Sequence, residues 1–188
     1  MIIYWLASYL IGNFLTAWWV GKWKGVDLRQ ELSGNLGARN AGAVIGKSAF
    51  MLTFLGDAAK SVLVILIGRH FNFDLSVIAI ACLAVICGHL FPIWLKGRGG
   101  KGIASFIGAT LVLTPHLFII MFIVFMLFFF LIKSATLTML TSFAAFIIAI
   151  VAYQETAALW PLVIAIILIV IKHQKDIKES FAARSNKT

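Results

Sequence analysis

The chain has 188 residues, of which 62% are apolar and 12% charged, and its formal net charge is +9. Soluble domains carry about a quarter charged residues, so this composition excludes an ordinary soluble domain. The apolar residues fall in runs near the ~20 residues that span the hydrocarbon of a bilayer, which predicts a polytopic membrane protein. The cations lie mainly in short loops, where they orient membrane helices, and the sequence therefore does not indicate a nucleic-acid site.

We expect a single membrane domain over residues 1–188, an all-α bundle of seven transmembrane helices, because a helix in lipid satisfies its own backbone hydrogen bonds. The predicted spans are 2–20, 47–68, 75–95, 102–113, 117–132, 137–152 and 158–171. Pro115 ends the fourth span, so a re-entrant pair at the fourth and fifth spans fits the sequence as well. A polar and basic tail, 172–188, follows the last span.

The distribution of Lys and Arg predicts the orientation of the chain. With the N-terminus outside, the inner loops and the tail contain every Lys and Arg except Arg69 and Lys60. Cytoplasmic loops carry such an excess of cations, so we expect the N-terminus outside and the C-terminus in the cytoplasm. The polar stretches at 33–40 and 96–102 then lie on the same cytoplasmic face as the tail.

The stretch 96–102, Lys-Gly-Arg-Gly-Gly-Lys-Gly, separates two apolar runs. Glycine permits φ > 0 and lets a ligand approach the backbone, and successive N–H groups in such a turn bind anions. Lys101 adds a point charge. A helix beginning near Gly102 directs its positive end at the same place. The turn therefore predicts a phosphate site at the membrane edge.

A second polar stretch, Ser-Gly-Asn-Leu-Gly-Ala-Arg-Asn, covers residues 33–40. Its small residues suit close backbone approach to a polar ligand, and Arg39 can grip a phosphate through its planar fork. The alternative is a polar loop in which Ser33 or Asn35 caps the next helix. The glycine turn on the same face favours the binding role.

Asp57 and Lys60 lie three residues apart and share one face of the second span. Ionisable groups inside a span are costly, and by default they indicate a functional site. We expect Lys60 to help hold a phosphate, with Asp57 orienting Lys60 or accepting a hydroxyl hydrogen bond. The alternative is a self-neutralising pair that only fixes helix packing.

His89 precedes the glycine turn and His173 follows the last span. Either can serve as a general base, and either can instead be a hydrogen-bonded core or interfacial residue; the sequence does not choose between them. The chain has no GxSxG nucleophile and no Walker phosphate loop. It also lacks clustered carboxylates of the kind that bind Mg²⁺, so no metal and no cofactor are expected.

Several motifs, in order along the chain, resemble those of one family. Residues 88–104 resemble the GH-FP…KGGKG-A signature of the PlsY-type acyl-phosphate:glycerol-3-phosphate acyltransferases. Residues 33–40 are similar to that family's SGNxGATN motif, and residues 56–61 resemble its D-x-x-K-G element. His173 looks like the histidine of its third motif. The resemblance covers nearly the whole chain.

The resemblance implies an enzyme of the bacterial inner membrane with seven helices and its active site on the cytoplasmic side. Such an enzyme moves a fatty acyl group from acyl phosphate to the 1-hydroxyl of glycerol 3-phosphate, giving lysophosphatidate and phosphate for phospholipid synthesis. The implied partners are these two substrates, membrane lipid and an enzyme that produces acyl phosphate, with no nucleic acid and no cofactor.

The resemblance also implies roles for particular residues. Those expected to serve the reaction directly are Lys101, His89, His173 and Asp57. Those expected to bind substrate are Ser33, Gly34, Asn35, Gly37, Arg39, Asn40, Lys60, Gly99, Gly100, Gly102 and Asp176.

The sequence departs from the family pattern at a few of these positions. Arg39 stands where the family usually has threonine, and Ala43 stands where it has arginine. Because positions four apart share a helix face, we hypothesise that Arg39 replaces the missing cation. Asp176 stands at a position that is commonly asparagine. The alternative functions are a transporter of a phosphate-bearing solute and a non-catalytic paralogue that binds acyl phosphate.

Overall fold

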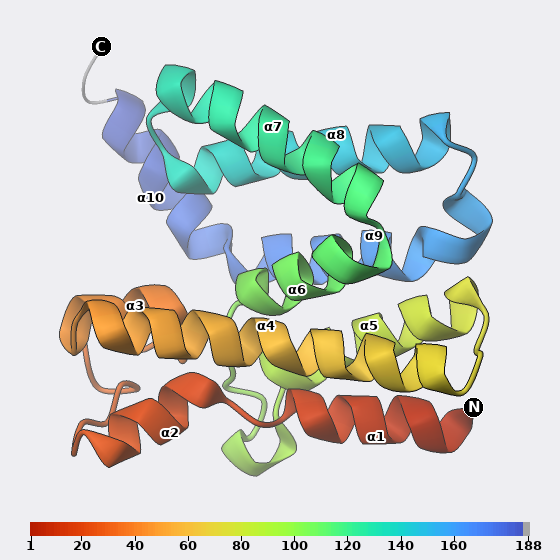
Figure 1. Cartoon of the computed structure of the whole chain (residues 1–188). Helices are drawn as coiled ribbons and strands as arrows, with labels where there is room; N and C mark the ends of the chain where they lie inside the picture. The colour runs from red at the N-terminus through yellow and green to blue at the C-terminus, as the bar shows by residue number, and fades with distance from the viewer. Residues whose placement is uncertain (186–188) are drawn as a thin grey trace.

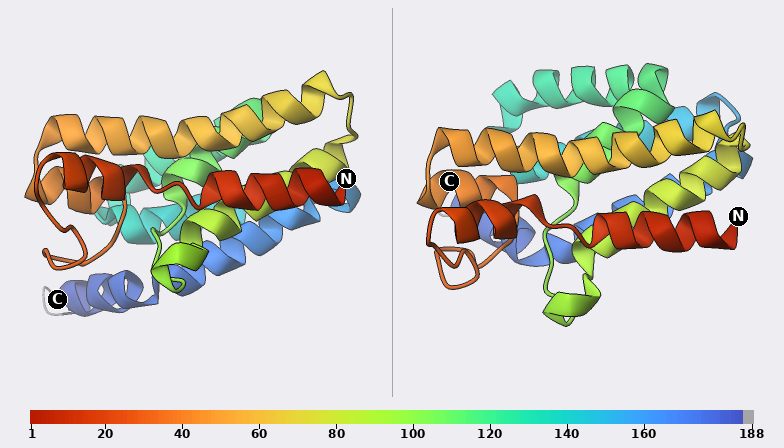
Figure 2. Two further views of the ribbon diagram at one scale, coloured as in Figure 1. Left: turned by 90° about the horizontal axis from the view of Figure 1, so that it is seen from below. Right: turned by 60° about the horizontal axis from the view of Figure 1, so that its bottom comes forward.

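The protein is all-helical over the residues that the structure, a computed structural model, describes, which are 1–185. The helices are α1 (Ile2–Gly12), α2 (Thr16–Trp23), α3 (Ala38–Val44), α4 (Lys47–His70), α5 (Leu75–Leu90), α6 (Ile103–Leu113), α7 (Pro115–Ile132), α8 (Ala135–Ala152), α9 (Thr156–Lys172) and α10 (Gln174–Ser185), with a 3₁₀ helix η1 (Ile93–Leu95) after α5. The predicted all-α architecture is confirmed. Figures 1 and 2 show the N-terminus and the end of α10 at opposite ends of the bundle.

The helices pack together in layers, and several of the packed pairs are not consecutive in sequence. α1 packs against α5, α4 against α6, α5 against α9 and α7 against α8. Figure 1 shows α1 and α2 along one side, α4 and α5 next to them, α6 and α9 in the middle, and α7 and α8 on the opposite side. α5 therefore lies between α1 and α9.

The close contact between α1 and α5 depends on two glycines. A Cβ at Gly12 would lie 2.1 Å from the carbonyl oxygen of Val85, and a Cβ at Gly88 would lie 2.1 Å from that of Tyr9. Real side chains do not approach backbone oxygens so closely. The two helices therefore meet backbone to backbone, as small residues allow in membrane bundles.

Four helices within residues 1–185 are long and apolar enough to cross a membrane: α4, α5 extended to Leu95, α7 and α8. α9 and α10 make a fifth candidate if they are counted as one span bent by 61°. α6 has only 11 residues, less than the ~20 that a straight span needs. The fold is that of a multi-pass membrane protein, and the count of seven spans stays a prediction.

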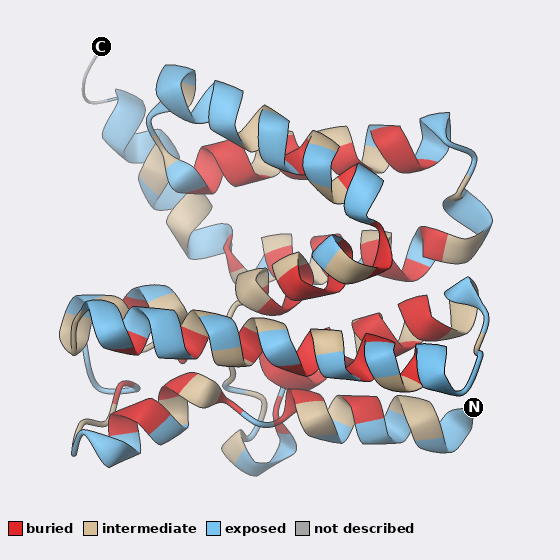
Figure 3. Ribbon diagram, in the orientation of Figure 1, coloured by how far each residue is buried: buried red, intermediate tan, exposed pale blue. Residues whose placement is uncertain are grey.

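The apolar surface of the bundle also fits a membrane. α7 is apolar beyond His116 in its first turn, yet its only buried residues are Leu117 and Met121. Figure 3 shows most of α7 and the outer face of α4 as exposed. A helix that is apolar all round is stable where its surroundings are lipid or protein rather than water.

The prediction of one continuous first span over 2–20 is wrong. α1 ends at Gly12 and α2 begins at Thr16, with Leu15 extended at φ −101° and ψ 105°. A break inside a membrane helix leaves carbonyl groups that need donors. The ammonium of Lys60 supplies them, donating to the carbonyls of Gly12 (3.2 Å) and Phe14 (3.0 Å). The break is therefore stabilised by a residue that is distant in sequence, which a local pattern does not show.

The basic tail is largely a helix. α10 follows α9 after a single residue, His173, and turns away from it by 61°. It contacts α8 and α9. The last three residues of the predicted tail, 186–188, lie outside the described part of the chain.

Candidate active site

The glycine turn connects α5 to α6 through a tightly hydrogen-bonded loop. Lys96 (φ 52°), Gly97 (φ 76°) and Gly102 (φ 85°) adopt the left-handed conformation that glycine tolerates best. Gly102 is the N-cap residue of α6, which begins at Ile103. The predicted start of this helix is confirmed, and its positive end faces the turn.

Five backbone amides of the turn, those of residues 96–100, donate to protein carbonyls and do not point at a ligand. The N–H groups of Gly99 and Gly100 donate to the carbonyls of Leu90 (3.3 Å) and His89 (3.0 Å) at the end of α5. Those of residues 96–98 donate to carbonyls within 92–95. These amides hold the turn against α5, so a phosphate at this place must be bound mainly by side chains and by the start of α6.

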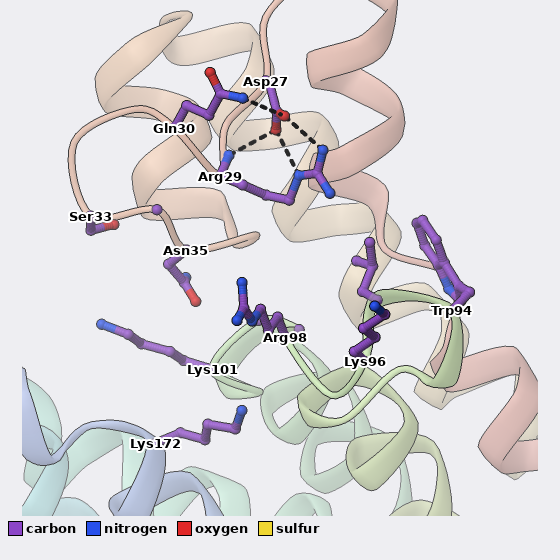
Figure 4. A pocket seen from close by; sticks show the side chains of 14 residues that line it. Asp27, Arg29, Gln30, Ser33, Asn35, Trp94, Lys96, Arg98, Lys101 and Lys172 are labelled. Carbon is purple, nitrogen blue, oxygen red and sulfur yellow. Dashed lines mark hydrogen bonds and ion pairs between the residues drawn. The ribbon is translucent and has the colours of Figure 1, made fainter.

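A cavity of about 710 Å³ lies between the turn and the loop that joins α2 to α3. Its lining residues are Asp27, Arg29, Gln30, Ser33, Gly34, Asn35, Trp94, Leu95, Lys96, Arg98, Gly99, Gly100, Lys101 and Lys172. Figure 4 shows Asn35 pointing toward Arg98 and Lys101 across this space. Two polar stretches that are far apart in sequence therefore face one another.

The cavity is strongly cationic. Its cations come from the α2–α3 loop, the glycine turn and the end of α9, and they are Arg29, Lys96, Arg98, Lys101 and Lys172. Asp27 is the one carboxylate that lines this cavity, and Arg29 binds it through Nε (2.9 Å) and a terminal nitrogen (2.7 Å). These hydrogen bonds lower the pKa of Asp27 from 3.8 to about 2. Such an excess of positive charge suits ligands with phosphate groups.

Lys101 is held at the edge of the cavity by an ion pair with Asp176 on α10. Both side chains are partly exposed, at 25% and 20%. The predicted cation and the predicted carboxylate are thus direct partners. A phosphate that binds Lys101 must share the ammonium with Asp176 or displace it.

The predicted residues of stretch 33–40 divide into two groups. Ser33, Gly34 and Asn35 line the cavity. Asn40 is buried outside it, and its amide donates to the Leu28 carbonyl (3.0 Å) while its oxygen accepts from the Ser33 hydroxyl (2.9 Å). Asn40 therefore shapes the loop that carries the lining residues.

The remaining members of that stretch lie beside the loop. Gly37 is the N-cap residue of α3, and a Cβ there would come within 2.8 Å of the Asn35 amide nitrogen. Arg39, in the first turn of α3, is exposed and does not line the cavity. It does lie near enough to act electrostatically on His173, as Lys101 and Asp176 do.

Asp57, Lys60 and His89 form a separate buried cluster beneath the turn. The Lys60 ammonium lies 3.2 Å from the Asp57 carboxylate and 2.7 Å from Nδ1 of His89. All three side chains are almost fully buried, and none lines the cavity. The predicted pairing of Asp57 with Lys60 is present, but the pair faces the α1–α2 break rather than the cavity.

The hydrogen bonds of the two histidines distinguish them, which the sequence could not do. An ammonium only donates, so Nδ1 of His89 accepts from Lys60 and the proton of the neutral ring lies on Nε2. A carbonyl only accepts, so Nδ1 of His173 donates to Ile169 (2.8 Å) and Nε2 of the neutral ring keeps its lone pair. His173 is therefore the histidine with a nitrogen that can take a proton.

Some lining residues were not singled out by sequence reasoning. Lys172 donates to the Gly97 carbonyl (3.3 Å) and lies over the ring of Phe91 at 4.3 Å. Trp94 donates through its indole nitrogen to the Asn13 carbonyl (2.9 Å) in the α1–α2 break. In the sequence, Lys172 resembles any cation that flanks a span, and Trp94 resembles any interfacial aromatic residue, so neither carried a signal.

Fold and cavity together define a multi-pass membrane protein with a strongly cationic cavity lined by two of its loops. The sequence profile of the family described as "Glycerol-3-phosphate acyltransferase" matches residues 2–183. The chain belongs to this family. The predicted class of enzyme, a membrane glycerol-3-phosphate acyltransferase, is thereby confirmed.

Individual relatives agree with this assignment. The chain is 42% identical over 172 residues to glycerol-3-phosphate acyltransferase 1 of Bacillus cereus (strain ATCC 10987 / NRS 248), covering 89% of this chain and 94% of that protein. It is 33% identical over 180 residues to glycerol-3-phosphate acyltransferase of Pseudomonas paraeruginosa (strain DSM 24068 / PA7), covering 95% of each.

Solved structures of one membrane enzyme have the same fold. Crystal structures of PlsY (YgiH), an integral membrane glycerol 3-phosphate acyltransferase, match in the glycerol 3-phosphate form with a TM-score of 0.88 and 27% identity. The lysophosphatidic acid form matches with a TM-score of 0.85 and 28% identity. Each match covers 97% of this chain and 92% of the other.

Proposed function

We propose that this protein transfers a fatty acyl group from acyl phosphate to the 1-hydroxyl of glycerol 3-phosphate, giving lysophosphatidate and inorganic phosphate. The observation that carries the proposal is the convergence of cations from three segments on one cavity beside the start of α6. Both proposed substrates bear phosphate. Acyl phosphate is already activated, so the protein has mainly to position the substrates and neutralise charge.

The proposed reaction is a direct displacement at the acyl carbon. The 1-oxygen of glycerol 3-phosphate forms a bond to the carbonyl carbon, and the bond from that carbon to the phosphate oxygen breaks. Phosphate leaves with the electron pair, which Lys101 and Arg98 stabilise from the turn. The hydroxyl proton goes to the departing phosphate or to Nε2 of His173, the free nitrogen beside Lys101 and Asp176.

Substrate binding is assigned by proximity to the cavity. Ser33, Asn35 and Lys101 contact phosphate oxygens in this proposal, and Arg39 adds charge from the start of α3. Gly34, Gly99 and Gly100 line the cavity through their backbone. A Cβ at each would meet protein atoms of Arg29 or His89, so the lack of a side chain lets the loops pack closely. The buried cluster beneath the turn, formed by His89, Asp57 and Lys60, supports the turn in this proposal and does not contact the phosphate.

We further propose that the chain crosses the bacterial inner membrane seven times and that the cavity opens to the cytoplasm. In support, every Lys and Arg except Arg69 and Lys60 falls in the loops and the tail that this topology places in the cytoplasm, where cations are enriched. Acyl phosphate arrives from an enzyme that produces it, and the acyl chain stays in the lipid beside the bundle.

The test is an assay of the purified full chain in detergent or lipid with palmitoyl phosphate and glycerol 3-phosphate. Phosphate release and lysophosphatidate are followed, with acyl-CoA as a parallel donor. Lys101→Ala should abolish product formation, whereas Lys175→Ala, which removes an exposed cation from α10, should not. Wild-type protein that makes product only from acyl-CoA would overturn the proposed donor.

The same experiment separates the alternatives. A folded protein that forms no product but exchanges glycerol 3-phosphate across vesicles would be a transporter. A protein that binds acyl phosphate without product or transport would be a non-catalytic paralogue. Against transport, the described lining cations belong to a single cavity formed by the α2–α3 loop, the glycine turn and the end of α9.

A further inference from the structure

Lys60 occupies the centre of a buried junction between three helices. Its ammonium lies within 3.2 Å of four acceptors: the carbonyls of Gly12 and Phe14, the carboxylate of Asp57 and Nδ1 of His89. An ammonium has three hydrogens, so its donor capacity is fully used by the protein. No donor is left for a substrate phosphate, and Lys60 does not line the cavity.

The junction joins both sides of the break between α1 and α2. Lys60 binds the carbonyls at the end of α1 and in the break. The Asp57 carboxylate accepts from the hydroxyl of Thr16 (3.1 Å), the first residue of α2. Unpaired carbonyls in a membrane interior are costly, so this pair keeps the two short helices in a fixed arrangement on α4.

The junction also reaches the glycine turn through His89. A Cβ at Gly100 would lie 2.1 Å from Nε2 of His89, so the imidazole ring lies directly against this glycine. The backbone of His89 accepts from the Gly100 N–H (3.0 Å). Lys60 holds Nδ1 of the same ring at 2.7 Å. The ring is thus fixed on one side by Lys60 and supports the turn on the other.

Gly100 directly precedes Lys101, so this support fixes the backbone from which the Lys101 side chain extends. We propose that Lys60 is a positioning residue that acts through His89 to hold the glycine turn and Lys101 in the geometry that binds substrate. This inference rests on the proposed function for its consequence in catalysis. Its structural part, the support of the turn by Lys60, is testable without any substrate.

The first experiment measures amide hydrogen exchange in the ligand-free full chain, in lipid nanodiscs. In Lys60→Met, peptides covering residues 96–102 should exchange about tenfold faster, since a hydrogen bond from a charged donor is lost. Peptides from α7 and α8 should not change. The matched control is Lys47→Met, which removes an exposed cation from the same helix.

Lys60→Met leaves Asp57 buried without its cation, which can prevent folding. The variant Asp57→Asn/Lys60→Met removes both charges, so it leaves no unpaired buried charge and the same exchange measurement can be made on it. A second measurement is the histidine ¹⁵N spectrum, with the His89 signal assigned from His89→Gln. Wild type should show the Nε2–H tautomer, and both Lys60 variants should show a mixture of tautomers.

Faster exchange confined to the turn, with loss of the fixed tautomer, is the expected result. Unchanged exchange at the turn in both variants would overturn the proposal, and so would equal acceleration in every helix, which would make Lys60 a general stabiliser. With acyl phosphate, the variants should lose kcat while the folded fraction is kept. If wild type makes no product, the proposed function fails, whereas the exchange and ¹⁵N results still decide the role of Lys60.

Discussion

Lys101 of the glycine turn and Asp176 of α10 form an ion pair that joins the two segments at the edge of the cavity. The Asp176 carboxylate therefore binds the same Lys101 ammonium that the proposed reaction requires to bind a phosphate group. Because both side chains are partly exposed, water screens the pair and its net stabilisation is small. The contact therefore bears more on ligand affinity than on the stability of the fold.

Asp176→Asn should tighten the binding of glycerol 3-phosphate about two- to fivefold, because it frees the Lys101 ammonium and removes a like charge from the phosphate site. The dissociation constant is measured by calorimetry on the purified protein. Glu179→Gln is the matched control, since it removes the same charge from the same helix at a pair with Lys175. Weaker binding in Asp176→Asn would show that the carboxylate helps to hold the substrate.

Arg39→Ala should raise the KM for glycerol 3-phosphate roughly two- to fivefold with little change in kcat, as expected for an exposed cation that attracts a phosphate from beside the cavity. The variant Arg39→Ala/Ala43→Arg places the cation one turn further along α3 and should restore the KM. Activity that stays unchanged in Arg39→Ala would remove this residue from the binding site.

Gly100→Ala should reduce activity by about a hundredfold, because displacing a catalytic segment by ~1 Å can cost that much. The new Cβ would lie 2.1 Å from Nε2 of His89 and 2.7 Å from the Leu36 carbonyl oxygen, so the turn has to shift. Initial rates and the melting temperature are measured together.

Gly97→Asn is the control for this prediction. Gly97 has φ 76°, which asparagine tolerates better than other residues, and no atom lies within 4 Å of its missing Cβ. Its activity should therefore stay near that of wild type. Equal losses of activity in Gly97→Asn and Gly100→Ala would mean that the activity falls because of backbone strain in the turn, and not because of the contact with His89.

The Asp27 carboxyl should titrate near pH 2, because the hydrogen bonds from Arg29 stabilise its charged form. The folded pKa lies below the ordinary value of 3.8, so the stabilisation by this pair is present above about pH 3.8 and is lost as the pH falls toward 2. Arg29→Gln should return the pKa to its ordinary range. Carboxyl ¹³C titration tests this, and a pKa that Arg29→Gln leaves near 2 would contradict it.

Some of the residues that the sequence predicted at a phosphate site lie together in the structure. Ser33, Asn35 and Lys101 line one cavity because two polar, glycine-containing stretches fall at the same end of the bundle. Lys60 and His89 were expected at the substrate, but they lie in a buried junction instead. Their catalytic or positioning roles stay predictions.

Composition and the spacing of apolar runs determined by themselves that this is an all-α membrane protein, because in lipid only internally hydrogen-bonded segments are stable. The glycine and lysine pattern of 96–102 likewise determined a turn ahead of a helix at Gly102. These are local properties, in which each residue depends on its neighbours along the chain.

The tertiary structure alone decided the break in the first span, the tautomer of His89 and the partner of Lys101. Each depends on a hydrogen bond or ion pair between residues far apart in sequence: Lys60 with the Gly12 carbonyl, Lys60 with His89, and Lys101 with Asp176. A buried polar group forms a hydrogen bond with whichever partner the fold brings within about 3 Å. That partner cannot be predicted from hydrophobic periodicity.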